Sequence, residues 1–262
     1  MKAKWLFFSV IFFMLGCTSI KNITPQKHAL VIQNFRFAPL GMLEQELVKR
    51  GYQISVFDAE HRGMQLAHMN PLDYDLVVVL GGLMSANDTE SYPYLEEEMR
   101  FLKTRDLHQK PSIGICLGAQ LMARSLGGSV RVGENGREFG VKELFLSDHG
   151  KKTPFKLLKN FPVVEAHNDT FDIPQGALLL ASSKQYKNQA FLHNKSLALQ
   201  FHPEADAHTV QIWMDIFQRN DNTEMKSKFG YLNEKLRPQI QKFWHSWLDM
   251  LEKNEPSLAA NF

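Results

Sequence analysis

Residues 112–120 read SIGICLGAQ, and this stretch decides the fold. Residues 112–115 predict a buried strand, and residues 120–126 predict a helix that Gly127 ends. Glycines stand two positions on either side of Cys116, where a sharp strand-to-helix turn leaves little room for side chains. Such a turn presents Cys116 at the carboxyl edge of a sheet, where open α/β folds bind their ligands. The stretch therefore predicts a nucleophile elbow in a parallel α/β sheet.

The neighbouring segments alternate between predicted strands and helices. The run at 75–80 is short and rich in valine, which suits a parallel strand covered on both faces. Further strands are expected at 28–33 and 52–57, with helices at 42–50 and about 94–104. We therefore expect a three-layer α/β fold, with a mainly parallel sheet and helices on both faces. We expect shorter strands that extend this sheet, and a closing helix at 208–217. The shorter strands are expected at 141–146, 163–166, 177–182 and 198–201.

The composition indicates a folded protein without a nucleic-acid partner. Of 262 residues, 44% are hydrophobic and 22% are charged, which is typical of a globular chain. The formal net charge is +2 and no long basic run is present, so nothing electrostatic favours nucleic acid. Residues 221–253 predict one or two amphipathic helices, and a packing role is the default expectation for this extension, 221–262.

The N-terminus predicts export. Two lysines precede an apolar run at 5–15, and small residues follow, which is the pattern of a signal peptide. The run is about half of the 20 residues that a spanning helix needs. The end also resembles a bacterial lipoprotein signal with Cys17 as the acylated residue, although Met14 stands where leucine is usual. We expect a leader at 1–17, a polar tether at 18–27 and membrane attachment on the periplasmic face. The alternative is an uncleaved leader or a wrong start codon, with a cytoplasmic protein.

Cys116 has few ways to form a disulfide. The chain contains two cysteines, and lipidation of Cys17 would leave Cys116 as a free thiol. A free thiol in an exported protein risks oxidation, so its retention calls for a reason. Catalysis would be such a reason.

A second motif follows the predicted strand at 198–201. Residues 200–204 read QFHPE, and residues two apart in an extended chain point to the same side, so His202 and Glu204 project together. Pro203 stiffens this geometry. His202 could accept the Cys116 thiol proton while Glu204 orients the imidazole. A lone His-x-Glu is usually a surface pair, but together with a cysteine elbow it predicts a Cys–His–Glu catalytic triad.

The segments at 114–120 and 200–204 closely resemble the two signatures of class I (triad-type) glutamine amidotransferase domains, such as the amidotransferase half of GMP synthase. The resemblance covers about 28–217, and we set the domain at 28–220. It implies a flavodoxin-like fold and oxyanion amides from Gly82 and Leu117. It further implies that Gln120, His167 and Asp169 help to hold a glutamine head group. The supporting segments at 81–85, 137–140 and 167–169 occur in the expected order.

Two departures from the family pattern bear on function. Leu83 stands where the family usually has a proline that stiffens the oxyanion loop. The chain also has no G-x-x-x-x-G-K-[ST] loop, and the residues after Phe217 are few for a synthase domain. The resemblance therefore implies a free-standing cysteine hydrolase that cleaves the γ-amide of glutamine, or a γ-glutamyl amide or peptide, through a γ-glutamyl thioester. No cofactor and no metal are expected.

One alternative is a non-catalytic or redox-sensing binding protein of the same superfamily, although the presence of both His202 and Glu204 argues against it. A structural lipoprotein with an inherited enzyme fold is a further alternative, and it ranks last. The substrate, any ammonia acceptor and the oligomeric state are left open.

Overall fold

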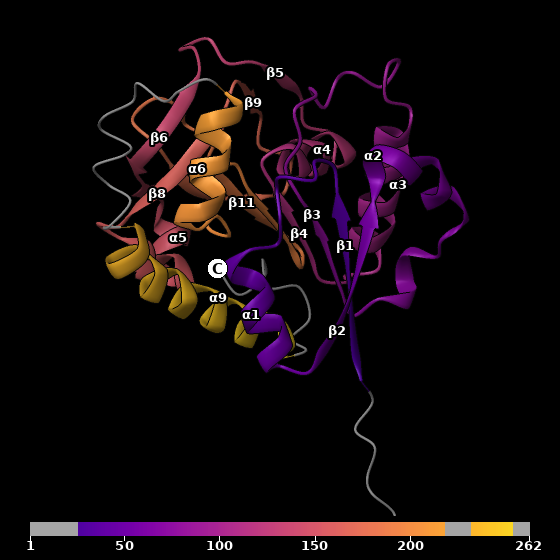
Figure 1. The fold of residues 1–262 in the computed structure, drawn as a ribbon, viewed down its shortest axis with the longest axis horizontal. Coiled ribbons are helices and arrows are strands. Elements are labelled where there is room, and N and C mark those ends of the chain that lie inside the picture. The colour runs from indigo at the N-terminus through magenta and orange to yellow at the C-terminus, as the bar shows by residue number, and fades with distance from the viewer. Residues whose placement is uncertain (1–25, 218–231, 254–262) are drawn as a thin grey trace, which may run out of the picture.

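The computed structural model describes residues 26–217 and 232–253. Its main sheet has eight strands in the order β2-β1-β3-β4-β12-β11-β10-β7 (Figure 1). The first five are parallel to one another, whereas β11, β10 and β7 continue the sheet from β12 in antiparallel fashion. The strands are β1 (Lys27–Gln33), β2 (Tyr52–Asp58), β3 (Leu76–Val79), β4 (Ser112–Ile115), β7 (Phe145–Leu146), β10 (Leu178–Ser182), β11 (Ala190–His193) and β12 (Ser196–Leu199).

Helices cover both faces of the sheet, which confirms the predicted three-layer fold (Figure 1). In β1, Ala29 and Val31 face one core, and Leu30 and Ile32 face the other. The first core contains side chains of α1 (Met42–Lys49), α6 (Ala207–Ile216) and α9 (Arg237–Glu252). The second contains those of α3 (Tyr94–Leu107) and α4 (Leu117–Ser125). Shorter helices are α2 (Ala59–Arg62), α5 (Asp148–Lys152), η1 (Gly63–His68), η2 (Pro71–Asp73), η3 (Pro154–Leu158) and a π-helical turn η4 (Leu232–Leu236).

Two further strand pairs lie beside the main sheet. Strand β5 (Val130–Val132) pairs with β9 (Asp169–Phe171), and β6 (Glu138–Glu143) pairs with β8 (Pro162–His167), both antiparallel. The prediction that residues 163–166 and 141–143 extend the main sheet is wrong, because β6 and β8 pair with each other, whereas residues 145–146 join the main sheet as β7. His167 of β8 pairs with Glu138 of β6 at 3.2 Å, a contact that an apolar sheet would not supply.

The predicted extension, 221–262, is helical over its described residues 232–252 and forms part of the core there, and residues 221–231 and 254–262 lie outside the described ranges. Helix α9 has an apolar face at positions three and four apart, as an amphipathic helix requires. Phe243, Trp244 and Trp247 of this face are fully buried. Phe243 and Trp247 pack against Phe155 of η3, and Trp244 packs against Phe243. Its far end reaches β1, where Glu252 pairs with Lys27 at 3.0 Å.

The leader, most of the tether and Cys17 lie outside the described residues. Within the described ranges, no helix combines the length and the apolar character needed to cross a membrane.

Candidate active site

Cys116 lies in the turn between β4 and α4. Its φ and ψ are 54° and −109°, a conformation that residues other than glycine rarely adopt. The two flanking glycines permit this turn. A Cβ at Gly114 would lie 2.5 Å from the carbonyl oxygen of Gly118, and a Cβ at Gly118 would lie 2.1 Å from that of Val79. The strained backbone thus holds Cys116 at the carboxyl edge of the sheet, as the elbow motif predicts.

The sulfur is largely buried but borders a cleft. Cys116 is 7% exposed, and its thiol lies 3.8 Å from the carbonyl oxygen of Ala166 in β8. Cys116 also lies at the N-terminus of α4, where amides without an acceptor in the helix can stabilise negative charge that develops on a bound group. The surroundings therefore suit a reactive cysteine better than an inert core thiol.

His202 and Glu204 follow β12 and face each other. Nδ1 of His202 lies 2.8 Å from Oε1 of Glu204, and both side chains are buried. Within the described ranges, Nε2 of His202 has no hydrogen-bond partner of ordinary geometry. Burial lowers the pKa of His202, but the charge of Glu204 and the interaction with the Cys116 side chain outweigh it and raise the pKa well above its usual value. The site therefore favours the imidazolium form of His202.

Gly81 brings Cys116 and His202 to the same point. A Cβ at Gly81 would lie 3.4 Å from both Cβ of Cys116 and Cε1 of His202. The side chains of Cys116 and His202 therefore both lie beside the residue that follows the end of β3 by two positions. The structure therefore gathers all three predicted catalytic residues at one edge of the sheet.

Two tryptophans, which no sequence motif singled out, hold residues 202–204 in place. The ring of Trp213 in α6 packs edge-on against His202, with centroids 4.6 Å apart. Trp244 of α9 donates its indole N–H to the carbonyl of Pro203 at 3.3 Å. Glu204 is fixed through its own backbone, because its carbonyl accepts the Met42 amide at 2.8 Å. The apolar faces of α6 and α9 predict that the two tryptophans are buried, but they do not predict which residues the tryptophans contact.

The predicted oxyanion residues adjoin each other. Leu117 is the first residue of α4, so its amide has no acceptor within the helix. Gly82 lies directly against it, because a Cβ there would lie 2.6 Å from Cδ2 of Leu117. Leu83 follows with 59% of its surface exposed. Gly82 and Leu117 both line the cleft that Cys116 lines, and their oxyanion roles remain a prediction.

A buried amide supports the strand that leads into this loop. The side chain of Asn34 donates to the carbonyl of Leu80 at 3.4 Å and to the carboxyl group of Glu98 at 3.0 Å. Its Cβ would also lie 3.1 Å from a Cβ at Gly82. Glu98 is fully buried, and burial raises its pKa to about 8, against the opposing effect of the Asn34 hydrogen bond. Neither residue was singled out from the sequence.

The predicted substrate-binding residues border the same cleft. It has a volume of about 510 Å³ and is lined by Cys116, Leu117 and Gln120 together with the 82–85 and 166–169 loops. Gln120 donates to the carbonyl of Asp169 at 3.3 Å, and the Asp169 carboxylate accepts the Ser85 hydroxyl at 2.6 Å. Both side chains thus shape the wall of the cleft. Arg137 adds a positive charge, with its guanidinium stacked over Phe217 at 4.7 Å.

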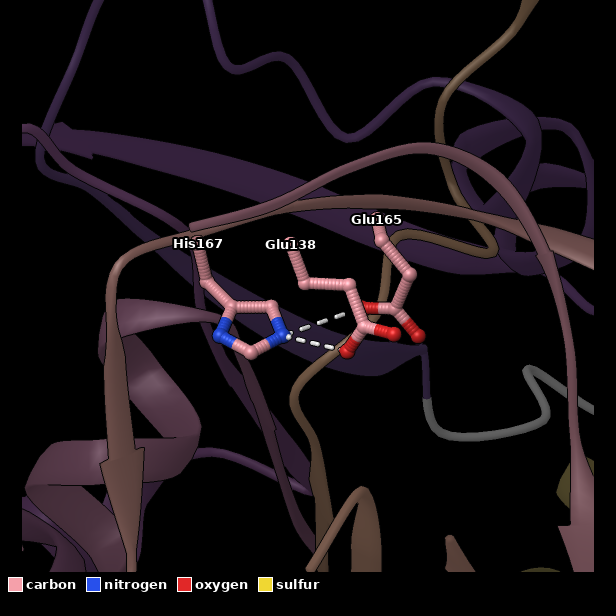
Figure 2. Close-up of side chains that lie close together, drawn as sticks. All are labelled: Glu138, Glu165 and His167. Atoms are coloured by element: carbon pink, nitrogen blue, oxygen red, sulfur yellow. Dashed lines mark hydrogen bonds and ion pairs between the residues drawn. The ribbon is translucent and has the colours of Figure 1, made fainter. Parts of the chain in front are cut away.

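His167 has both ring nitrogens engaged by protein groups. Nδ1 lies 2.9 Å from the Asp169 carbonyl, and Nε2 lies 3.2 Å from Glu138 and 3.4 Å from Glu165 (Figure 2). Burial lowers the pKa of His167, but these two carboxylates raise it to about 10. Contact of His167 with substrate therefore remains a prediction. No sequence pattern indicated that the two glutamates meet it.

The chain is therefore an open α/β protein with a thiol in a strained strand-to-helix turn and a buried His–Glu pair beside it. A model of the family described as glutamine amidotransferase class-I matches residues 33–212, and the chain belongs to this family.

Individual relatives agree with this assignment. The glutamine-hydrolysing GMP synthase subunit of Sulfolobus acidocaldarius is 32% identical over 57% of this chain and 81% of the relative. Gamma-glutamyl peptidase 4 of Arabidopsis thaliana is 26% identical over 72% of this chain and 80% of the relative. A solved glutamine amidotransferase from Thermotoga maritima superposes with a TM-score of 0.74 and 28% identity, covering 86% of this chain and 98% of that one.

Proposed function

We propose that the protein is a cysteine hydrolase that cleaves the γ-amide of glutamine, or a γ-glutamyl amide or peptide. One observation carries the proposal. Cys116 occupies a strained turn against His202, whose Nδ1 lies 2.8 Å from the Glu204 carboxyl group. Family membership supports the γ-carbonyl as the target, and the similarity to a gamma-glutamyl peptidase supports substrates other than free glutamine.

In the first half of the proposed reaction, the Cys116 thiolate attacks the γ-carbonyl carbon. The oxygen becomes negative and is stabilised by the amides of Gly82 and Leu117. His202 then donates its proton to the leaving nitrogen, which departs as ammonia or an amine and leaves a γ-glutamyl thioester. Glu204 keeps the imidazolium oriented and compensates its charge.

The second half returns the enzyme to its starting state. His202, now neutral, accepts a proton from water, and the resulting nucleophile attacks the thioester carbon. The C–S bond breaks, the thiolate is regenerated beside the imidazolium, and glutamate leaves. No external oxidant, reductant or cofactor is needed for this balance.

The test is glutamate release from three substrates. Glutamine, glutathione and a chromogenic γ-glutamyl anilide are each incubated with the native chain and with Cys116→Ala, after circular dichroism has shown that both are folded. We expect release from at least one substrate and none by the variant. Release from glutathione alone would assign the peptidase branch, and release from glutamine alone would assign the glutaminase branch. A folded native chain that is inactive on all three would refute the proposal and favour the binding protein.

We also propose that the protein is exported and anchored through Cys17, on the residue pattern of 1–17. Processing in a bacterial host should be blocked by globomycin, and Cys17→Ala should release the protein from the membrane fraction. An uncleaved product in the cytosol would contradict this location.

A further inference from the structure

Behind the cleft, β6 and β8 bring three ionisable side chains together. In the antiparallel register Glu138 lies opposite His167, and Gly140 lies opposite Glu165. Glu165 and His167 are two residues apart on β8, so their side chains leave the same face. All three side chains are buried, and Figure 2 shows both carboxyl groups converging on one ring nitrogen. The proposed hydrolysis does not use these carboxyl groups.

We propose that Glu138, Glu165 and His167 bind a divalent transition-metal ion such as Zn²⁺. Nε2 of His167 lies 3.2 Å from Oε2 of Glu138 and 3.4 Å from Oε2 of Glu165, and one donor atom from each residue lies within 4.8 Å of the others. Two ligands at about 2.1 Å from a tetrahedral zinc ion are separated by about 3.4 Å. The donor set of one imidazole and two carboxylates suits zinc and its first-row neighbours.

The groups around the donors have the arrangement of an outer ligand shell. Nδ1 of His167 lies 2.9 Å from the carbonyl of Asp169, and a carbonyl can only accept, so Nδ1 carries the proton. In the neutral imidazole, Nε2 then carries the lone pair toward the two carboxyl groups, and a bound ion would replace the proton that the ion pair holds there. Oε2 of Glu138 accepts the Ser183 hydroxyl at 3.0 Å and the Gln189 amide at 2.7 Å. Metal-binding carboxylates and histidines are usually oriented in this way.

Polar atoms without hydrogen bonds point to a ligand at the same place. Glu165 is 0% exposed, and within the described ranges neither of its carboxyl oxygens has a hydrogen-bond partner beyond the ion-pair contact with His167. The side-chain oxygen of Gln189, also 0% exposed, lacks one as well. The Gln189 amide group lies within 3.4 Å of Nε2 of His167, so it borders the cluster. Buried carboxylates are costly unless they are paired or bind a metal ion. A divalent cation would neutralise both charges.

An ion could reach the cluster from outside. Glu138 also lines an open cleft of about 560 Å³, together with Lys142, Glu143 and Gln185. His167 borders the separate cleft that contains Cys116. The carbonyl of Ala166, between the two β8 ligands, is the group that contacts the Cys116 thiol. A bound ion would therefore fix the β8 wall of the candidate active site.

The experiment measures metal binding in a Cys116→Ala background, so that zinc held by the thiol cannot be mistaken for this site. The full-length chain is stripped with a chelator and titrated with Zn²⁺, and with Co²⁺ for its absorption bands. We expect one equivalent to bind, with Co²⁺ bands typical of four or five ligands. The unfolding temperature should rise by about 5 °C or more when zinc exceeds its Kd a hundredfold.

Substitutions then locate the ion. In the Cys116→Ala background, Glu165→Gln and His167→Gln should each raise the Kd for zinc by about tenfold to a hundredfold. Glu143→Gln, an exposed glutamate on the same strand as Glu138, is the matched control and should bind as the parent does. Absence of stoichiometric binding by the folded parent would overturn the proposal and leave a protonated His167 between the carboxylates. Equal binding by the parent and the two ligand variants would overturn it as well. Because the readout needs no turnover, its failure is distinct from failure of the proposed hydrolysis.

Discussion

The buried carboxyl group of Glu98 should make the stability of this protein fall as the pH rises. Burial raises its pKa from an ordinary value of 4.5 to about 8 in the folded chain. Between these values the folded state holds a proton that the unfolded state has released, so unfolding becomes easier with increasing pH. Each pH unit in this range corresponds to about 1.4 kcal/mol, and the penalty at pH 7 is therefore about 3 kcal/mol.

Glu98→Gln removes the ionisation while keeping an oxygen that can accept the Asn34 hydrogen bond. The free energy of unfolding is measured by urea titration of the native and variant chains at pH 5, 6, 7 and 8. The stability of the variant relative to native should increase by about 2 to 3 kcal/mol between pH 5 and pH 7. Groups that titrate in both proteins cancel in this difference.

The control is Glu96→Gln, because Glu96 is an exposed glutamate in the same helix. Its stability should follow the native pH dependence. If the Glu98→Gln and native curves run parallel from pH 5 to pH 8, Glu98 is not held protonated, and the reasoning from its burial is wrong.

Three further substitutions test the candidate site. Glu204→Gln should lower kcat/KM about a hundredfold or more. The alkaline limb of the kcat/KM pH profile should also move to lower pH, because the charge that raises the His202 pKa is lost. An unmoved alkaline limb would contradict the role of Glu204 in holding His202 protonated. Gly41→Ala should unfold or strongly destabilise the chain, because the new Cβ would lie 2.1 Å from the Glu204 carbonyl oxygen and Gly41 has a φ of +56°. Gly51→Ala is the control, since nothing lies within 4 Å of a Cβ there. Its free energy of unfolding in chemical denaturation should fall by only about 1 kcal/mol. Arg137→Leu should raise KM for γ-glutamyl substrates about tenfold with a smaller change in kcat, because Arg137 lines the cleft. A lower kcat at an unchanged KM in steady-state kinetics would exclude attraction of the substrate by this charge.

Local patterns were sufficient to predict the elbow and the parallel half of the sheet. Cys116 stands between a buried strand and a helix. The spacing of the glycines around it predicts a sharp turn, because the residues that would clash there are close to Cys116 in the sequence. The His–Pro–Glu motif could be predicted for the same reason, since His202 and Glu204 are two residues apart.

Features that depend on strand pairing could not be predicted. The meeting of Glu138 with Glu165 and His167 depends on the register of β6 against β8, across a segment that contains a turn, a short strand and two short helices. Strand β11 was also missed, because its four residues lie in a short apolar run that periodicity alone does not assign. The support of Pro203 by Trp244 joins segments 41 residues apart, and no local rule specifies that contact.

Helix α9 has a consequence for how the protein would lose activity on heating. It packs on α1 and η3 and holds Pro203 through Trp244, but it contributes no strand to the sheet. Six of its side chains are buried in the first core, so detachment of α9 would expose the aromatic cluster that it shares with the sheet. Helix α9 and the histidine segment should therefore open together with the sheet. Thermal inactivation should coincide with loss of sheet structure, and amide exchange in α9 should be as slow as in the central strands.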